Sequence, residues 1–304
     1  MTIQQLKYLI EVVNTGSINE AARNLFISQP TLSKSIKLLE TEMGIVIFTR
    51  SSKGITLSSD GAEFLSYARQ VVEQVNLMER RYLDSPYQEQ LLSVSTQHYS
   101  FSVDAMVKMI DKYGGDKYQF TLRETRTFEI IEDVKNMTSE VGVLFMSNFN
   151  SKVLSQLIKE NQLIFEPLFT ASPHVFISKD NPLAEKDLVT LEELTPYPRL
   201  AYEQGHNNSF YFTEEILRTL DSPKDILVSD RATLFNCLIG LNGYTISSGV
   251  LNADLNGTDI TPVRLDVEDQ ITVGTLVNKK AQLSRMAKLY LEELEKCIIS
   301  YNLL

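Results

Sequence analysis

From residue 91 onward the chain alternates short apolar runs with segments of helical periodicity, and this alternation restricts the possible folds most strongly. VGVLFM (141–146) and ITVGTLVN (271–278) predict buried strands, whereas FSVDAMVKMIDKY (101–113) predicts an amphipathic helix. Apolar strands separated by helices are typical of parallel or mixed sheets with helices on both faces. About 210 residues suffice for two such sheets, so we expect a two-lobed α/β domain.

The first sixty residues predict a separate, mainly helical unit. Apolar residues within 3–13 share one helical face, with Thr2 as its N-cap and Gly16 as its end. SINE (17–20) matches a capping box and opens a short second helix. The adjacent Ala21 and Ala22 predict a close crossing of two helices.

A third helix is predicted from Ser28 to Met43, with Pro30 in its first turn, where no amide hydrogen is needed. Its wet face carries hydroxyls, an amide and lysines rather than the usual Glu–Lys pairs. The segment IVIFTRSSKGITLS (45–58) then reads as a hairpin around a polar turn. Three helices followed by a hairpin have the order of a winged helix-turn-helix.

Residues 61–82 predict a long helix with a wide apolar stripe. Its 22 or so residues would span about 33 Å, which is long for so small a domain, and a second copy of the chain is the natural partner for the stripe. Residues 84–86 would end this helix, and SPYQEQ (85–90) would form a hinge.

Charge is distributed unevenly along the chain. Residues 1–60 hold six Lys or Arg and five Asp or Glu, a net charge of +1, and the remaining 23 basic and 34 acidic residues give −11. An acidic body repels phosphate and leaves one cationic end to approach DNA. The first residues lack a basic export signal and no run is long enough for a membrane span, so we expect a cytoplasmic protein with no membrane partner.

An ordered set of residues resembles the LysR-type transcriptional regulators, and the resemblance covers the whole chain. The mild departures are Ile47, where the family pattern has Leu, and Ser58, where it has Thr. The matching residues are Ser17, Ala21, Ala22, Leu25, Ser28, Gln29, Pro30, Ser33, Ile36, Leu39, Glu40, Gly44, Phe48, Arg50, Leu57 and Gly61.

The resemblance implies an α/β multidomain protein in three parts. These are a winged helix-turn-helix DNA-binding domain (1–60), a linker and dimerisation helix (61–86) and an effector-binding domain (87–304) resembling a periplasmic binding protein. Lobe I would comprise about 91–163 and 267–304, and lobe II about 164–266. Such proteins commonly work as tetramers, so a homodimer or homotetramer is expected. The resemblance also implies double-stranded promoter DNA, a small effector and RNA polymerase as partners.

The third helix would enter the major groove. Gln29 can address adenine through two hydrogen bonds, and Thr31 can contact thymine. Hydroxyls and lysines suit phosphates, which fix position rather than sequence. The predicted DNA contacts are Ser28, Gln29, Pro30, Thr31, Ser33, Lys34, Lys37, Arg50 and Lys53.

The effector would bind between the lobes, beyond the carboxyl ends of the strands. Hydroxyls beside a helix N-terminus suggest a carboxylate, and Glu203 could meet an ammonium group, so an amino acid competes with an organic acid as the effector. The predicted contacts are Thr96, His98, Tyr99, Ser100, Ser147, Asn148, Glu203, Gln204, Ser247 and Ser248.

Simpler interpretations compete at several of these positions. His98 could equally cap the following helix. Cys237 and Cys297 are expected in or near the core, and the pairs Glu192–Glu193, Glu214–Glu215 and Glu292–Glu293 on solvated helix faces. The histidines lack metal-ligand spacing, so neither a metal nor a cofactor is expected.

An enzyme and a solute-binding protein are the two competing function classes. An enzyme would need a reactive motif, but the sequence contains no G-x-S-x-G, H-E-x-x-H or Walker loop, so the chain is not expected to be an enzyme. A solute-binding protein would have no use for residues 1–60.

Overall fold

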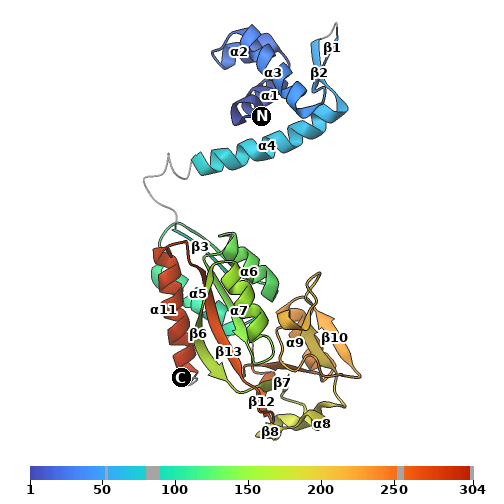
Figure 1. Cartoon of the computed structure of the whole chain (residues 1–304), viewed down its shortest axis with the longest axis vertical. Helices are drawn as coiled ribbons and strands as arrows, with labels where there is room; N and C mark the ends of the chain where they lie inside the picture. The colour runs from blue at the N-terminus through green and yellow to red at the C-terminus, as the bar shows by residue number, and fades with distance from the viewer. Residues whose placement is uncertain (52–53, 80–89, 252–256, 302–304) are drawn as a thin grey trace. The chain divides into compact units, whose positions relative to one another are not determined.

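The computed structural model describes residues 1–51, 54–79, 90–251 and 257–301. The chain divides into two compact units, Met1–Gln88 and Glu89–Leu304 (Figure 1). Within the described residues, none of the helices has the length and apolarity needed to cross a membrane.

The N-terminal unit has the predicted order of three helices, a hairpin and a long helix. Strands β1 and β2 pair antiparallel, as expected for a hairpin. The elements are α1 (Ile3–Thr15), α2 (Ile18–Asn24), α3 (Gln29–Met43), β1 (Phe48–Ser51), β2 (Gly54–Leu57) and α4 (Ser59–Glu79).

Side-chain hydrogen bonds cap the N-termini of α1, α2 and α3. Thr2 and Gln5 form a capping box, in which the Thr2 hydroxyl accepts from the Gln5 amide at 3.2 Å and the Gln5 side chain accepts from the Thr2 amide at 2.8 Å. The Ser17 hydroxyl accepts from the Glu20 amide at 3.4 Å, but the predicted return bond from the Glu20 side chain is absent among the described residues. Ser28 caps α3 as predicted, and α1 and α3 each end at a left-handed glycine.

One apolar cluster joins all four helices of this unit. The paired alanines of α2 are fully or almost fully buried in it, as their small size predicted. Its buried members are Leu6, Leu9, Val12, Ala21, Ala22, Leu32, Ile36, Leu39, Ile47, Leu65, Ala68 and Val72.

The carboxylate of Glu40 fastens the hairpin to α3. Its Oε1 atom accepts hydrogen bonds from the backbone amides of Ile47 at 2.8 Å and Phe48 at 3.0 Å. A carboxylate that satisfies two backbone donors fixes where the hairpin leaves the third helix.

The first turn of α4 lies directly against the same point of the chain. The Ser58 amide donates to the Ile47 carbonyl at 2.9 Å. A Cβ atom at Gly61 would lie 2.2 Å from that carbonyl oxygen, so only glycine fits there. The hairpin, α3 and the start of α4 therefore meet at one residue.

Replacing Glu40 with alanine is expected to destabilise the N-terminal unit by about 1–3 kcal/mol, because two backbone donors lose their acceptor. Thermal unfolding followed by circular dichroism measures this. Glu42→Ala on the same helix is the control, because Glu42 is half exposed and pairs with the N-terminal amine at the surface, and it should change stability little. Equal losses in both variants would contradict the role given to Glu40.

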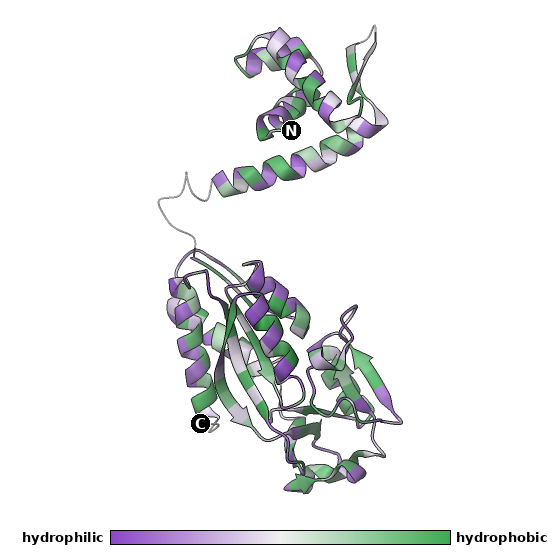
Figure 2. Cartoon of the chain, viewed as in Figure 1, coloured by the Kyte–Doolittle hydropathy of each residue, from purple (hydrophilic) through white to green (hydrophobic). Residues whose placement is uncertain are grey.

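Helix α4 carries two apolar stripes rather than the single predicted one. It has 21 residues and spans about 31 Å, and apolar positions recur along its length in Figure 2. Leu65, Ala68 and Val72 pack into the core of the unit. A second stripe is exposed and consists of Tyr67 (61%), Val71 (41%) and Met78 (56%). The predicted continuation to residue 82 and the hinge at 85–90 lie outside the described residues, apart from residue 90.

Lobe I of the C-terminal unit is built on a five-stranded mixed sheet of order β4-β3-β5-β13-β6. β3 runs parallel to β4 and β5, whereas β13 runs antiparallel to β5 and β6. Its elements are β3 (Gln90–Thr96), α5 (Ser100–Tyr113), β4 (Tyr118–Glu124), α6 (Thr127–Lys135), β5 (Val141–Met146), α7 (Ser151–Glu160), β6 (Leu163–Ala171), β13 (Ile271–Asn278) and α11 (Arg285–Ser300).

Strand β5 shows why this sheet is covered on both faces. Val143 and Phe145 belong to the cluster formed with α5 and α11. Leu144 and Met146 belong to the cluster formed with α6 and α7. Because side chains alternate along a strand, a continuous apolar run requires helices on both sides, as the sequence predicted.

Lobe II is built on a six-stranded mixed sheet of order β10-β9-β11-β7-β12-β8. The first sheet keeps the chain through Ala171, because β6 pairs with β13, so lobe I extends eight residues beyond the expected boundary at residue 163. The elements of lobe II are β7 (His174–Ser178), η2 (Pro182–Glu185), β8 (Leu188–Val189), α8 (Leu191–Leu194), β9 (Arg199–Tyr202), η3 (Phe210–Phe212), β10 (Asp225–Val228), α9 (Arg231–Gly240), β11 (Tyr244–Ser247) and β12 (Ile260–Leu265).

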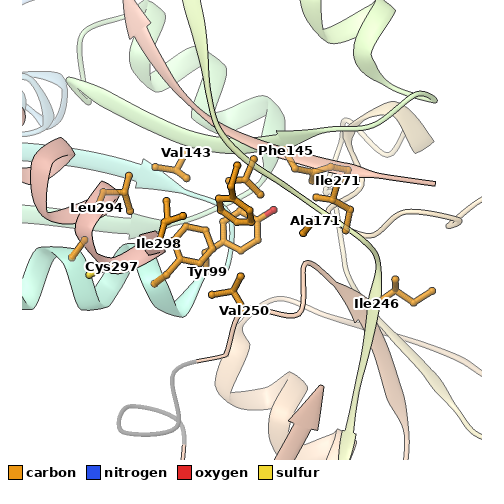
Figure 3. Close-up of a cluster of buried hydrophobic side chains, with 14 of the residues drawn as sticks. Tyr99, Val143, Phe145, Ala171, Ile246, Val250, Ile271, Leu294, Cys297 and Ile298 are labelled. Carbon is orange, nitrogen blue, oxygen red and sulfur yellow. The ribbon is translucent and has the colours of Figure 1, made fainter. Parts of the chain in front are cut away.

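A single apolar cluster runs from one lobe into the other (Figure 3). Tyr99, at the start of α5, and Phe145 come from lobe I, and Ile246 and Val250 come from lobe II. The two lobes therefore share one apolar core.

The two cysteines lie in or beside apolar clusters, as expected. Cys297 is buried, and Cys237 is partly buried beside the core of lobe II. Burial, helped by the neighbouring Asp104 carboxylate, raises the pKa of Cys297 to about 11. A thiol with such a pKa is almost entirely protonated at neutral pH and reacts slowly.

Candidate functional site: the face of α3 and the cleft between the lobes

The outer face of α3 is polar and locally organised. Gln29 donates through Nε2 to the Ser33 hydroxyl at 2.7 Å, and the hydroxyls of Ser28 and Thr31 lie 2.7 Å apart. The opposite face of the helix is buried in the core. Short polar groups held in this way present donors and acceptors without a long acidic side chain to repel a duplex.

The turn before α3 presents an aromatic ring that the sequence analysis missed. Phe26 is 96% exposed and has a φ of +55°, a left-handed conformation that a bulky residue seldom adopts. An exposed apolar ring beside a recognition face suits contact with a thymine methyl group or a sugar.

The cleft between the lobes holds a buried histidine that is paired across it. His98 of lobe I places Nδ1 2.8 Å from Oε2 of Glu214 in lobe II, and both side chains are 4% exposed. The His98 ring also stacks on Tyr202, with 3.8 Å between centroids. Burial alone would lower the pKa of His98, but the charge and hydrogen bond of Glu214 outweigh it and raise that pKa above its ordinary value.

Two further charge pairs cross the cleft. Arg231, at the start of α9, places Nη2 3.1 Å from Oε1 of Glu124 at the end of β4. Arg126 donates through Nε to the Glu203 carbonyl at 3.2 Å and pairs with the Glu203 carboxylate. The lobes are thus drawn together by opposite charges at three places.

Glu215 forms no ion pair with any residue that the structure describes. Its side chain is buried, and Oε1 accepts one hydrogen bond from the Tyr202 amide at 2.9 Å. Burial, and then the charge of Glu214, raise the pKa of Glu215 to about 8. The Glu215 carboxyl group is therefore mostly protonated at neutral pH.

Six buried side-chain polar atoms lack a hydrogen bond in the described part of the chain, and those of Glu214, Glu215 and Arg231 belong to residues that line a cavity of the cleft. Five of the six are oxygens. The six atoms are Glu124 Oε1, Gln204 Oε1, Glu214 Oε1, Glu215 Oε2, Ser248 Oγ and Arg231 Nη1. Buried polar atoms are normally satisfied, so the three such atoms on residues of one cavity indicate a place for a missing polar ligand or water.

Two cavities meet at Glu215. The first, of about 30 Å³, is lined by His98, Tyr99, Ser100, Ser247 and Glu215, among others. The second, of about 190 Å³, has polar lining residues that include Ser147, Asn150, Thr213, Glu215 and Asp269.

A larger hollow of about 600 Å³ lies on the outer side of lobe I, beside α7 and β6. None of the unpartnered buried atoms in the described chain belongs to its lining residues, so the cleft is the better candidate for a specific ligand.

Comparison with known proteins agrees with this arrangement. The model of the bacterial regulatory helix-turn-helix protein, lysR family, matches residues 3–62, and the LysR substrate binding domain matches residues 114–297. The chain belongs to the LysR family of bacterial regulators. It is a DNA-binding transcriptional regulator with an effector-binding domain, as the resemblance implied, and not an enzyme.

Several LysR-family relatives match much of the chain. It is 23% identical to the uncharacterised regulator YybE of Bacillus subtilis, over 95% of this chain and 97% of that protein. It is 27% identical to MetR of Haemophilus influenzae over 64% and 60%, and 26% identical to the uncharacterised YnfL of Escherichia coli over 69% and 68%.

Solved structures share the fold. Full-length CbnR complexed with its target DNA has a TM-score of 0.55 at 17% identity, covering 98% of this chain and all of that one. An OxyR mutant of Corynebacterium glutamicum has a TM-score of 0.55 at 16% identity, covering 98% and 94%.

Half of the predicted effector residues of this LysR-family chain line one of the two cavities. Gln204 and Ser248 line neither cavity, although each has a buried side-chain atom without a hydrogen bond. Lining residues of the first cavity include His98, Tyr99, Ser100 and Ser247, and those of the second include Ser147. Contact with a ligand stays a prediction for all of them.

Three predicted effector residues are placed differently. Thr96 is buried and donates to the Gln97 carbonyl at 2.8 Å. Asn148 is exposed and lines neither cavity. Glu203 is already held by Arg126, so it is not free to bind an ammonium group.

Two interpretations of charged residues were wrong. His98 does not cap α5, whose N-cap is Tyr99 without a side-chain bond, because its ring pairs with Glu214 instead. The pair Glu214–Glu215 is buried in the cleft, and Glu293 is 1% exposed beside Lys112 and Lys296.

Of the predicted DNA contacts, Ser28, Pro30, Thr31, Lys34 and Lys37 are exposed on α3 or at its cap, and Gln29 and Ser33 are half-buried. Arg50 lies in β1, where the structure does not describe its side chain, and Lys53 lies outside the described residues.

Proposed function

We propose that this chain binds promoter DNA as a homodimer or homotetramer, with α3 of each copy in a major groove, and that a small effector in the cleft controls it. The polar outer face of α3, with exposed Ser28, Thr31 and Lys34 beside the half-buried Gln29, carries this proposal. The second apolar stripe of α4 supports self-association, because it is exposed on a helix long enough to pair.

Because a transcriptional regulator must reach promoter DNA, we propose that the chain works in the cytoplasm. We also propose RNA polymerase as one of its partners. The effector is proposed to bind between the lobes, because a cavity there is lined by Glu214, Glu215 and Arg231, each with an unpartnered buried atom.

Gln29 and Lys34 are expected to play separable roles. Gln29→Ala should cost about 1–3 kcal/mol at one base position, whereas Lys34→Ala should weaken binding to every sequence alike and reduce the salt slope by about one. Fluorescence anisotropy on a duplex selected from a random pool, and on its scrambled form, measures both. Lys152→Ala, an exposed lysine of α7, is the control. Equal losses on both duplexes for both variants would refute the division of roles.

Effector binding is proposed to change how far the lobes close and thereby the spacing of the two DNA-binding heads on bent DNA. The effector must bind one arrangement better than the other to shift their balance. Footprints of the promoter with and without effector test this coupling. An unchanged footprint and bend angle at saturating effector would rule it out.

A further inference from the structure

The hollow on the outer side of lobe I, here called the outer hollow, differs in character from the cleft. It lies beside α7, the start of β6 and the turn that follows β13 (Figure 1). Its volume of about 600 Å³ is within the range of about 300–1,000 Å³ that is typical of small-molecule pockets. None of its described lining residues lines either cavity of the cleft. The outer hollow is therefore a separate candidate site.

The floor of the outer hollow is apolar. Met146, Ile158 and Leu163 are buried members of the cluster that β5 forms with α6 and α7, and Phe165 packs against that cluster. All four also line the hollow, so part of each side chain faces it. Apolar surface that is removed from water on binding contributes to affinity roughly in proportion to its area. The floor therefore suits a ligand with a ring or a branched alkyl group.

The rim of the outer hollow is cationic. Lys159, Lys279 and Lys280 line it and are exposed. None of the three forms an ion pair with any residue that the structure describes, whereas seven other lysines do. The described lining residues also include no Asp or Glu, although the chain after residue 60 holds 34 acidic and only 23 basic residues. Three positive charges without a counter-charge attract an anion, and lysine binds phosphate as a point charge.

The backbone that carries two of these lysines is held in place. The Lys279 amide donates to the Gln162 carbonyl at 3.0 Å, and the Lys280 amide donates to Oδ1 of Asn278 at 2.9 Å. The Asn278 side chain is largely buried, and its Nδ2 atom donates to two carbonyls at the end of α6, at 3.3 and 3.1 Å. A fixed backbone reduces what must be ordered when a ligand binds. The rim is thus partly preorganised for an anion.

We propose that the outer hollow is a second small-molecule site, which binds an organic anion with an apolar body and more than one negative charge. The ring or branched chain of the ligand lies on the floor, and its phosphate or carboxylate groups lie among the three lysines of the rim. This site goes beyond the proposed function, which needs only the effector of the cleft. The cleft itself is lined by several carboxylates and does not suit the same ligand.

Isothermal titration of the full-length chain with 1-naphthyl phosphate, inorganic phosphate and 1-naphthol tests the proposal. The ester combines an aromatic body with about two negative charges at about pH 7.5, whereas phosphate lacks the apolar body and 1-naphthol lacks the charge. The ester should bind at least about tenfold more tightly than either of the other probes. Because salt screens exposed charges, its affinity should fall between about 50 mM and about 300 mM NaCl.

Changing all three rim lysines to Gln should weaken ester binding at least about tenfold, and Lys159→Gln alone about two- to fivefold. The matched control changes Lys117, Lys152 and Lys288 to Gln. These lysines are exposed and do not line the outer hollow, so the net charge of the chain changes equally. The control should bind the ester as the wild type does, and circular dichroism should show both variants folded.

Four results would overturn the inference. They are unchanged ester binding by the rim variant, equal losses in both triple variants, an ester affinity no higher than that of inorganic phosphate, and no ester binding by a chain that still binds its selected duplex. A chain that binds the ester through the rim lysines but binds no duplex would contradict the proposed function and support this site.

Discussion

Val71→Asp is expected to make the chain monomeric and to lower its affinity for a two-site promoter by about 10²–10⁴-fold, because a second linked binding event is lost. Val71 lies in the exposed stripe of α4 and not in the core, so its replacement leaves the fold of the N-terminal unit intact. Light scattering measures the molecular mass, and anisotropy on promoter duplexes measures the affinity.

Gln70→Asp is the control for Val71→Asp, since Gln70 is its exposed neighbour outside the stripe and receives the same charge. It should stay dimeric. A dimeric Val71→Asp protein with unchanged promoter affinity would show that the copies pair elsewhere.

Glu215 should make the effector domain less stable as pH rises. Its pKa is raised to about 8 in the folded chain, whereas a glutamate in an unfolded chain has a pKa of about 4.3. The folded state therefore holds the proton more tightly, and this contribution is complete below about pH 4.3 and is lost at about 1.4 kcal/mol per pH unit up to about pH 8.

Urea unfolding followed by circular dichroism, repeated from about pH 5 to pH 8, measures this slope. The raised pKa of His98 acts in the same direction, so the effect of Glu215 is read as the difference between wild type and Glu215→Gln. Glu192→Gln should keep the slope of the wild type. If Glu215→Gln keeps it too, the Glu215 carboxyl group is ionised in the folded state.

Local features were predictable because a few neighbouring residues determine them. Ser28 as a cap needs only the amide of Thr31, three residues along the chain. The position of β6 depends on β13, more than ninety residues later. Its sequence, LIFEPLFTA, does not show which sheet it joins, and the lobe boundary was therefore placed too early.

The charged groups of the cleft were the least predictable. Glu214 meets His98 across 116 residues of sequence. A pair of adjacent glutamates is usually solvated, and only the approach of the other lobe buries this one. The same holds for Glu203, which was assigned to a ligand although Arg126 of the other lobe occupies it. An ionisable group between lobes depends on contacts that no local pattern records.

The meeting of three elements at Ile47 has a mechanical consequence. The Glu40 carboxylate accepts a hydrogen bond from the Ile47 amide, and the backbone of Gly61 lies so close to the Ile47 carbonyl that a methyl group would not fit. We therefore expect the hairpin, α3 and the first turn of α4 to move as one body. In a pair of chains joined along α4, the point at which the two long helices cross would then set the distance between the two DNA-binding domains.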